Sequence, residues 1–581
     1  MGPKPFMLQD ALKQYCHDQD KIITPEQTVE HFRKRLAQSG LNILDDIVRI
    51  DKGRLGIPVY FSICGPDARQ ATGNYKQMGK GATPEQSQAS AVMELGERFS
   101  LFSFVRNPRN FTLAPRRSLG ATCMDFDQIA RSVDDDAEDL AIVSEMFSSL
   151  PLQWTWAYNL TRDKAEMVPF NWFWTINQFN GSSAGNCNEE ALCQGICEVV
   201  ERHVSALISG NCIKVPQIRM ESINDPVALE LIGKYTAAGI ELRLSDFTLD
   251  MGIPTIGALA WDPATFPDRS EIVWTAGTTP SPSKALCRAL TEVAQLAGDF
   301  NSGGNYEASG LPKFRTLEQA GYITTPGVDV ALSDLPEISD NNIKQEITHC
   351  VSALARHEMD VYAVDVKHPV LAIPAFYTII PGTRFRERAA HSSVGMIIAK
   401  IITESFAPPQ ALEQLNGFDA RLPNKYYIHF YLGQMHLERG YHQTALIHLT
   451  RALDLDPPPE DLASVYTYMG ICHKDMERYD AARQVLEKGH QIDPERTDTL
   501  NLLGFCHYKL GAHEPAIACF EKLIALDPSS AIDYANIASN YRAMGKKPEA
   551  IQYYQLALSL DAGIEFAREH LSQMGVDPDA T

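Results

Sequence analysis

A helical pattern that carries several acids runs through residues 183–202, SAGNCNEEALCQGICEVVER. At about 100° per residue, four polar side chains fall within an arc of about 80°: Glu190, Gln194, Glu198 and Glu201. Apolar residues fill the rest of the circumference, which predicts a helix buried on more than one side. The preceding SAGN turn offers backbone N–H groups that could meet an anion at the helix start. This stretch therefore predicts a buried polar stripe.

Two other segments repeat the arrangement. In GKGATPEQSQASAVMELGERFS, residues 79–100, three polar side chains share an arc of about 60°: Ser90, Glu94 and Glu97. In SPSKALCRALTEVAQ, residues 281–295, the same i, i+4, i+7 spacing recurs at Arg288, Glu292 and Gln295. The sequence thus predicts three helices that each carry a polar stripe.

The stripes have two interpretations. Glu94 with Arg98, and Glu198 with Arg202, stand at i, i+4 and could form ordinary intrahelical ion pairs, which contribute little. Repetition on three helices favours the other interpretation, because neighbouring like charges are unfavourable where water is excluded. Mg²⁺ takes carboxylate oxygens and often brings phosphate and water as its other ligands. We therefore expect a Mg-nucleotide site between the three helices.

Familiar catalytic motifs are missing from the sequence. The nearest phosphate-loop candidate, GNYKQMGKGAT, has five residues between Gly73 and Gly79 and no Ser or Thr directly after Lys80. Kinase signatures and HExxH do not occur, and no GxSxG or Cys/His pair stands in a recognisable context, so zinc hydrolysis and acyl-enzyme chemistry have no support. A nucleotide would have to be held by the helical stripes.

These segments together resemble the YcaO family. GKGAT, then S-x-x-x-E-x-x-E-R from Ser90 to Arg98, then SAGN with E-x-x-E-R up to Arg202, then R-x-x-x-E-x-x-Q from Arg288 to Gln295, occur in the family's order. The resemblance covers roughly residues 25–410. It implies an ATP- and Mg²⁺-dependent enzyme that uses glutamates in place of a phosphate loop.

Residue roles follow from the resemblance position by position. It implies metal and phosphate ligands at Glu94, Glu97, Glu198 and Glu201. It implies further acidic residues of the nucleotide site at Glu190 and Glu292. Contacts with nucleotide or phosphate are implied for Ser90, Arg98, Asn186, Gln194, Arg202, Arg288 and Gln295, and Lys80 is a candidate phosphate contact.

The family's chemistry is the O-phosphorylation of a peptide backbone amide after a nucleophile adds to its carbon. Attack by a side chain gives an azoline, and attack by sulfide gives a thioamide. No protein nucleophile is needed. The azoline-forming members end in PxPxP, whereas this sequence ends GVDPDAT, so it resembles stand-alone bacterial members with C-terminal repeats. Some of these are linked to β-methylthiolation of a small-subunit ribosomal protein, which suggests an accessory or scaffold role as the alternative.

Helical repeats follow the acidic segments. Gly433, Gly470, Gly504 and Ala538 are spaced 37, 34 and 34 residues apart. Alanine recurs twelve residues after each anchor, at Ala445, Ala482, Ala516 and Ala550, and proline recurs after three of them, at Pro457, Pro494 and Pro528. This period resembles the tetratricopeptide family. His436, His473 and His507 occupy equivalent positions, where repeat packing is favoured over metal binding.

The remainder of the sequence favours a mixed α+β domain. Leu152, Trp154, Trp156 and Tyr158 alternate with smaller residues, as in a half-buried strand, and EIVWTAGTT, DVYAVDVKH and AIPAFYTIIPG also predict strands. A helix is predicted by Ile343, Ile347, Val351 and Leu354. We expect an N-terminal segment (1–24), a YcaO-type catalytic domain (25–410), a linker (411–422) and an all-α tetratricopeptide domain (423–576).

Composition limits the partners. The 581 residues include 52 basic and 73 acidic ones, a formal charge of -21, which disfavours nucleic acid and anionic lipid. Twelve cysteines lack a CxxC pair, and Cys193 and Cys197 read as packing residues. The DDDAEDL segment near residue 134 reads as a solvated loop. Without a signal peptide or about 18 consecutive apolar residues, we expect a cytoplasmic protein without membrane contact.

The expected partners are a peptide or protein substrate and, through the repeats, a sulfur-transfer or methylthiotransferase protein or a second copy in a homodimer. A pure chaperone-like repeat protein is disfavoured, because it leaves the three acidic stripes unexplained.

Overall fold

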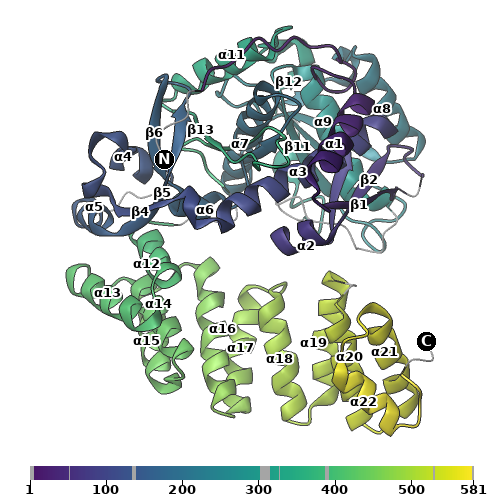
Figure 1. Cartoon of the computed structure of the whole chain (residues 1–581). Helices are drawn as coiled ribbons and strands as arrows, with labels where there is room; N and C mark the ends of the chain where they lie inside the picture. Colours follow the sequence, from purple (N-terminus) through teal and green to yellow (C-terminus); the bar gives the residue numbers. More distant parts are fainter. Residues whose placement is uncertain are drawn as a thin grey trace. The chain divides into compact units, whose positions relative to one another are not determined.

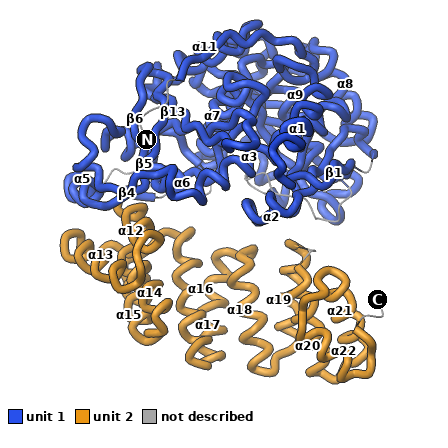
Figure 2. The backbone as a smooth tube through the Cα atoms, in the orientation of Figure 1, with its two compact units in different colours: residues 1–394 blue, residues 395–581 orange. Residues whose placement is uncertain are grey.

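The computed structural model describes residues 6–51, 53–133, 139–300, 314–325, 327–385, 392–527 and 530–578. The chain divides into two compact units, residues 1–394 and residues 395–581, which are coloured separately in Figure 2. Among the described residues, no helix combines the length and the apolar character that a membrane crossing requires. The acidic loop at 134–138 and the repeat proline Pro528 lie outside the described residues.

Three β-sheets form the framework of the first unit (Figure 1). The first sheet is antiparallel, with β1 (Leu44–Arg49), β2 (Val59–Cys64) and β3 (Lys76–Lys80). The second has the order β11 (Val273–Thr278), β10 (Thr255–Trp261), β9 (Glu241–Asp246), β8 (Gln217–Ile218) and β12 (Asp329–Val330). The third has the order β4 (Thr112–Pro115), β5 (Pro151–Asn159), β13 (Tyr362–Asp365), β14 (Ala375–Ile379) and β7 (Ser182–Ala184), and β6 (Lys164–Pro169) also pairs with β5.

Helices cover these sheets. The three long ones are α3 (Pro84–Arg106), α7 (Asn188–Asn211) and α9 (Pro282–Ala297), which contain the predicted polar stripes. The others are α1 (Pro25–Ser39), α2 (Pro66–Thr72), α4 (Phe126–Ala130), α5 (Leu140–Ser149), α6 (Phe170–Asn177), α8 (Pro226–Ala237), α10 (Gly321–Thr324) and α11 (Ile343–Ala355). Helix α3 packs on β3, α9 packs on β10 and β11, and α7 packs on β7 and β14. Each striped helix therefore packs mainly on a different sheet, and each also contacts a second sheet.

Local sequence explains where the striped helices begin. The Thr83 side chain accepts a hydrogen bond from the Gln86 backbone N–H, and Pro84 occupies the first turn of α3, where its missing donor is harmless. At the start of α7 the Cys187 sulfur accepts from the Glu190 backbone N–H. Helix α9 also begins with a proline, Pro282. These starts fix where each polar stripe faces.

Two glycines let strands approach the striped helices closely. A methyl group at Gly79 of β3 would lie 2.2 Å from the Ala91 nitrogen of α3. A methyl group at Gly277 of β11 would lie 2.4 Å from the Ala285 carbonyl oxygen of α9. Backbone atoms cannot move aside as a flexible side chain can. Glycine at both positions therefore sets the distance between strand and helix.

The α+β prediction is confirmed. The four expected strands are present in the structure as β5, β11, β13 and β14, and the expected helix is present as α11. The expected half-buried alternation of β5 is wrong, because Thr155 and Ala157 on the second face are also buried. β5 pairs with β4, β6 and β13, so it is an interior strand and not a surface one.

All the regular secondary structure in the described residues of the second unit is α-helical. It contains α12 (Val394–Ser405), α13 (Pro408–Arg421), α14 (Tyr426–Glu438), α15 (His442–Asp454), α16 (Pro459–Asp475), α17 (Tyr479–Ile492), α18 (Thr497–Lys509), α19 (His513–Leu526), α20 (Ala531–Ala543), α21 (Lys547–Leu560) and α22 (Glu565–Gln573). The repeat anchors lie on the first helix of the pairs α14/α15, α16/α17, α18/α19 and α20/α21, and the four alanines lie buried on the second. The predicted repeats are confirmed.

Residues 411–422, where we expected a linker, instead form most of helix α13. Ala411, Leu412, Leu415 and Phe418 are buried on one face of it, the spacing of an amphipathic helix that the proline before it obscured. Cys193 and Cys197 are buried on α7.

The close strand-helix approach predicts a stability effect. Gly79→Ala or Gly277→Ala should lower the free energy of unfolding by about 1–3 kcal/mol, because the added methyl overlaps backbone atoms. Gly210→Ala is the matched control, since Gly210 is exposed on α7 with open space around it. Denaturant unfolding measures all three variants. Equal stability of the Gly79, Gly277 and Gly210 variants would contradict the packing argument.

Candidate functional site

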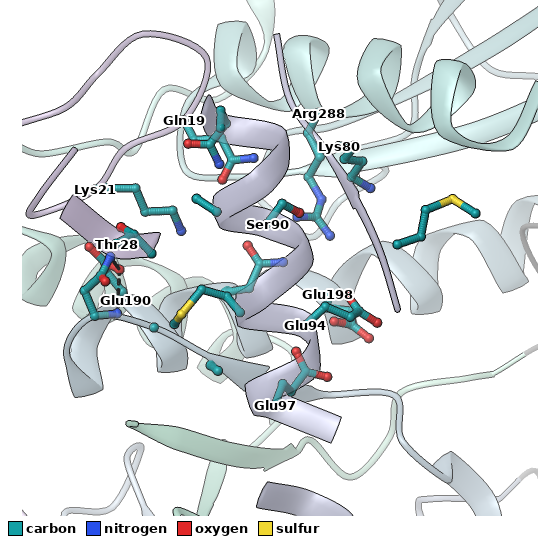
Figure 3. A pocket seen from close by; sticks show the side chains of 18 of the residues that line it. Gln19, Lys21, Thr28, Lys80, Ser90, Glu94, Glu97, Glu190, Glu198 and Arg288 are labelled. Atoms are coloured by element: carbon teal, nitrogen blue, oxygen red, sulfur yellow. Dashed lines mark hydrogen bonds between the residues drawn. The ribbon is translucent and has the colours of Figure 1, made fainter. Parts of the chain in front are cut away.

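A cavity of about 220 Å³ lies where α3, α7, α9 and strand β3 face one another (Figure 3). All predicted site residues except Glu201 line it: Lys80, Ser90, Glu94, Glu97, Arg98, Asn186, Glu190, Gln194, Glu198, Arg202, Arg288, Glu292 and Gln295. Figure 3 shows Glu94, Glu97 and Glu198 on one side of the cavity and Lys80 and Arg288 on another. The three polar stripes therefore converge on one cavity.

The carboxylates of α3 are held by an arginine of the same helix. Arg98 Nη2 lies 2.9 Å from Glu94 Oε1, and Arg98 Nη1 lies 3.4 Å from Glu97 Oε1. The Ser182 hydroxyl also donates to Glu97 over 2.6 Å. Burial raises the pKa of Glu97 well above its usual range, with Arg98 opposing and Glu94 and Glu198 adding to the rise. The ion pair between Glu94 and Arg98 that the alternative interpretation predicts is therefore present. Arg98 alone does not supply enough positive charge to neutralise both Glu94 and Glu97.

The carboxylate of Glu198 on α7 is also buried, and its pKa is also raised. The Gly181 backbone N–H donates to its Oε1 over 3.4 Å. Burial raises the pKa of Glu198, although the guanidinium groups of Arg202, Arg98 and Arg288 oppose the shift. A cation placed between Glu97 and Glu198 would relieve this unfavourable burial of negative charge.

Glu201 lies behind the cavity wall. Its Oε2 accepts hydrogen bonds from the Thr278 backbone N–H and from Arg288 Nε, each over 3.1 Å. Its side chain is only 3% exposed. In this arrangement Glu201 fixes Arg288, and Arg288 is the group that faces the cavity.

Lys80, Glu292 and Glu190 of the cavity wall also have polar partners. The Lys80 ammonium contacts the Glu292 carboxylate, and burial followed by the nearby Arg288 lowers the pKa of Lys80 to about 7. Glu190 accepts from the Asn186 backbone N–H over 2.9 Å and from Asn186 Nδ2 over 3.0 Å. The cavity thus holds lysine and arginine side chains interleaved with carboxylates, a surface suited to a ligand that carries both phosphate and a metal ion.

Sequence reasoning missed part of the wall. Gln19, Lys21 and Thr28 line the cavity from the N-terminal region, at and beyond the edge of the expected catalytic domain (Figure 3). The Ile22 backbone N–H donates to Glu190 over 2.6 Å, which ties this segment to α7. No hydrophobic period marks residues 6–24, and Lys21 directly follows Asp20 in a segment with several other charges, so the sequence does not single it out.

The cavity fits a Mg-nucleotide better than a lone metal ion. Among the described residues, no three His, Cys, Asp or Glu side chains are grouped so that they could hold a metal. Mg²⁺ is usually bound by one or two carboxylates and completed by phosphate and water, which Glu94, Glu97 and Glu198 can satisfy together with a nucleotide. Gln295 Oε1 is buried without a hydrogen-bond partner among the described residues, so it can accept a donor from a ligand.

The two units match different protein families. Residues 78–384 match the model described as YcaO cyclodehydratase, ATP- and Mg²⁺-binding. Residues 474–541 and 534–563 match two tetratricopeptide repeat models.

Individual relatives show how far the likeness extends. An uncharacterized protein of Methanothermobacter thermautotrophicus is 29% identical over 385 residues, 62% of this chain and 94% of the relative. The ribosomal protein S12 methylthiotransferase accessory factor YcaO of Escherichia coli K12 is 25% identical over 341 residues, 52% of this chain and 56% of that protein.

A solved structure supports the same fold. It is YcaO from Methanopyrus kandleri bound with AMPPCP and Mg²⁺, with a TM-score of 0.50, 22% identity, and coverage of 65% of this chain and 95% of that one. Because the family model covers more than half of the sequence and contains all three striped helices, the chain belongs to the YcaO family of ATP- and Mg²⁺-binding proteins.

Proposed function

We propose that the cavity binds Mg-ATP and that the protein activates a backbone amide of a peptide or protein substrate by O-phosphorylation. The observation that carries the proposal is the convergence of carboxylates from α3 and α7 with cationic side chains from β3, α7 and α9 on a single cavity. Family membership supports this type of reaction, since the matching model is described as a cyclodehydratase.

We assign a role to each cavity residue from the charge of its side chain. One or two of Glu94, Glu97 and Glu198 would hold the cation, because these cavity carboxylates lie near enough for the charges of Glu94 and Glu198 to raise the pKa of Glu97. Bound Mg²⁺ would supply electrostatic stabilisation of the phosphoryl group during transfer. Arg202 and Arg288 would bind phosphate oxygens, and Glu201 would keep Arg288 oriented through the 3.1 Å contact. Lys80, Ser90, Asn186, Gln194 and Gln295 would position the nucleotide.

The reaction needs no nucleophile from the protein. A nucleophile adds to the amide carbon and loses its proton, the amide oxygen takes the γ-phosphoryl group as ADP leaves, and inorganic phosphate then departs with the former amide oxygen. In the azoline branch the amide nitrogen loses its proton as the C=N bond forms, and in the thioamide branch the nitrogen keeps its proton and a C=S bond forms. The product is an azoline when a substrate side chain attacks and a thioamide when sulfide attacks. Intact-mass comparison separates the branches, since the first loses one water and the second exchanges oxygen for sulfur.

The proposal predicts that removing a central carboxylate abolishes turnover. Glu198→Ala should reduce Mg-dependent ATP hydrolysis by at least about a hundredfold, because one buried cation ligand is lost. Glu201→Ala should also reduce it, through the displaced Arg288 side chain. Steady-state phosphate release measures both variants.

The control for this experiment is Glu230→Ala, since the Glu230 side chain on α8 is 64% exposed and pairs only with Lys234 of its own helix among the contacts the structure records. Unchanged nucleotide binding and hydrolysis in both the Glu198 and Glu201 variants would refute the proposed site.

A second candidate function is an accessory role in β-methylthiolation of a small-subunit ribosomal protein. It is favoured by the 25% identity with the accessory factor of Escherichia coli. In this role the repeats would recruit a sulfur-modifying protein. Phe505 on α18 is a candidate contact, because it is exposed and two lysine ammonium groups, Lys474 and Lys509, lie 5.8 and 5.5 Å from its ring.

The enzyme role and the scaffold role predict opposite effects of these variants on methylthiolation of the ribosomal protein in cells. As a scaffold, the protein should support methylthiolation when it carries Glu198→Ala and fail when it carries Phe505→Ala with Lys509→Ala, because only the repeat surface is then used. The intact mass of the ribosomal protein from cells complemented with each variant is the readout. If methylthiolation is lost with Glu198→Ala and kept with Phe505→Ala plus Lys509→Ala, the scaffold role is excluded.

A further inference from the structure

The N-terminal loop, residues 9–22, closes on itself before the chain reaches α1. The Tyr15 backbone N–H donates to the Lys21 carbonyl over 3.0 Å, and the Lys21 N–H donates back to the Tyr15 carbonyl over 2.9 Å. The Tyr15 hydroxyl donates to Asp18 over 2.9 Å. The loop is therefore a defined structural unit, although it contains no helix.

This loop is attached to the elements that form the cavity. The Gln9 backbone N–H donates to Glu189 of α7 over 2.6 Å. The Ala82 N–H, in the turn between β3 and α3, donates to Asp18 over 2.7 Å. The Lys284 ammonium of α9 donates to the Cys16 carbonyl over 2.9 Å. Contacts with three sides of the cavity fix the position of the loop, and they place its Gln19 and Lys21 in the cavity wall.

A buried ion triad ties the loop to α11. Lys13 Nζ lies 2.7 Å from Asp20 Oδ2 and 2.5 Å from Glu346 Oε1. The side chains of Lys13 and Glu346 are 5% and 3% exposed. Burying charge is unfavourable unless the charges pair well, so the triad is stable only while the loop keeps Asp20 beside Lys13. Asp20 stands between Gln19 and Lys21, the two loop residues that reach the cavity.

We propose that Lys13 is a positioning residue for the nucleotide cavity and that its ion pairs with Asp20 and Glu346 hold the N-terminal loop closed, so that Lys21 contacts the phosphate groups of ATP. The inference rests on the proposed function, since it concerns the same cavity. Lys13 itself does not line the cavity, so it acts through Lys21. A merely stabilising Lys13 would affect folding without affecting nucleotide affinity through Lys21.

A double-mutant cycle with Mg-AMPPCP tests the inference. Lys13→Met should weaken binding about tenfold, the size expected when one charge-assisted hydrogen bond is lost. Lys21→Met should weaken it by a similar factor, and the double variant should bind no more weakly than Lys21→Met alone. Lys13→Arg, which keeps the charge, should restore most of the affinity. Lys34→Met, on the exposed side of α1, is the matched control and should bind as the wild type does.

Wild-type affinity in Lys13→Met, or losses that add in the double variant, would overturn the inference. If Lys13→Met does not fold, Glu346→Gln replaces it, because that change removes one acidic partner of Lys13 and leaves Asp20 to pair with its ammonium group. Its effect should again be absent in a Lys21→Met background, and an additive effect would overturn the inference.

Failure of the wild-type protein to bind Mg-AMPPCP would refute the proposed function instead. The position of the loop has its own readout, which does not need nucleotide. Amide hydrogen exchange of residues 13–21 should be faster in Lys13→Met than in the wild type, and equal exchange would show that the triad does not hold the loop.

Discussion

Burial of carboxylates between three helices is the constraint on which the first unit depends. Glu97 and Glu198 belong to different helices, yet each lies in the electrostatic field of the other, and burial raises the pKa of both. Such an arrangement is unfavourable unless positive charge lies close by. Arg98, Arg288 and Lys80 provide part of that charge, each in contact with a particular glutamate. The remainder is what a metal ion bound with a nucleotide would bring.

Each striped helix packs mainly on a different sheet of the framework that holds these charges. Helix α3 packs on β3, α9 on β11, and α7 on β7 and β14. Glycines at the two closest approaches leave no room for adjustment, so the stripes are fixed in distance and in rotation. The N-terminal loop then closes the cavity from a region that precedes the family match.

Periodicity determined how much of the structure could be predicted. The polar stripes have the period of a helix turn and the repeats have the period of a helix pair, so the helices of both followed from spacing. The convergence of the three stripes on one cavity depends on how the helices pack on the sheets, which spacing does not determine. The orientation of Glu201 toward Arg288 did not follow, because an arc of 80° on α7 contains both cavity-facing and buried directions. The loop with Lys21 has no period and is held by backbone hydrogen bonds and the Lys13 triad. Burial on both faces of β5 depends on its interior place in the sheet, which local sequence does not encode.

The central claim is that the converging carboxylates bind a nucleotide through Mg²⁺. Isothermal titration of the wild-type chain with AMPPCP, in excess Mg²⁺ and in excess EDTA, tests it directly. We predict saturable binding of one nucleotide per chain with Mg²⁺ and loss of that binding with EDTA, because the buried glutamates would then repel the phosphates. Equal affinity in the two conditions, or no binding with Mg²⁺, would contradict the account.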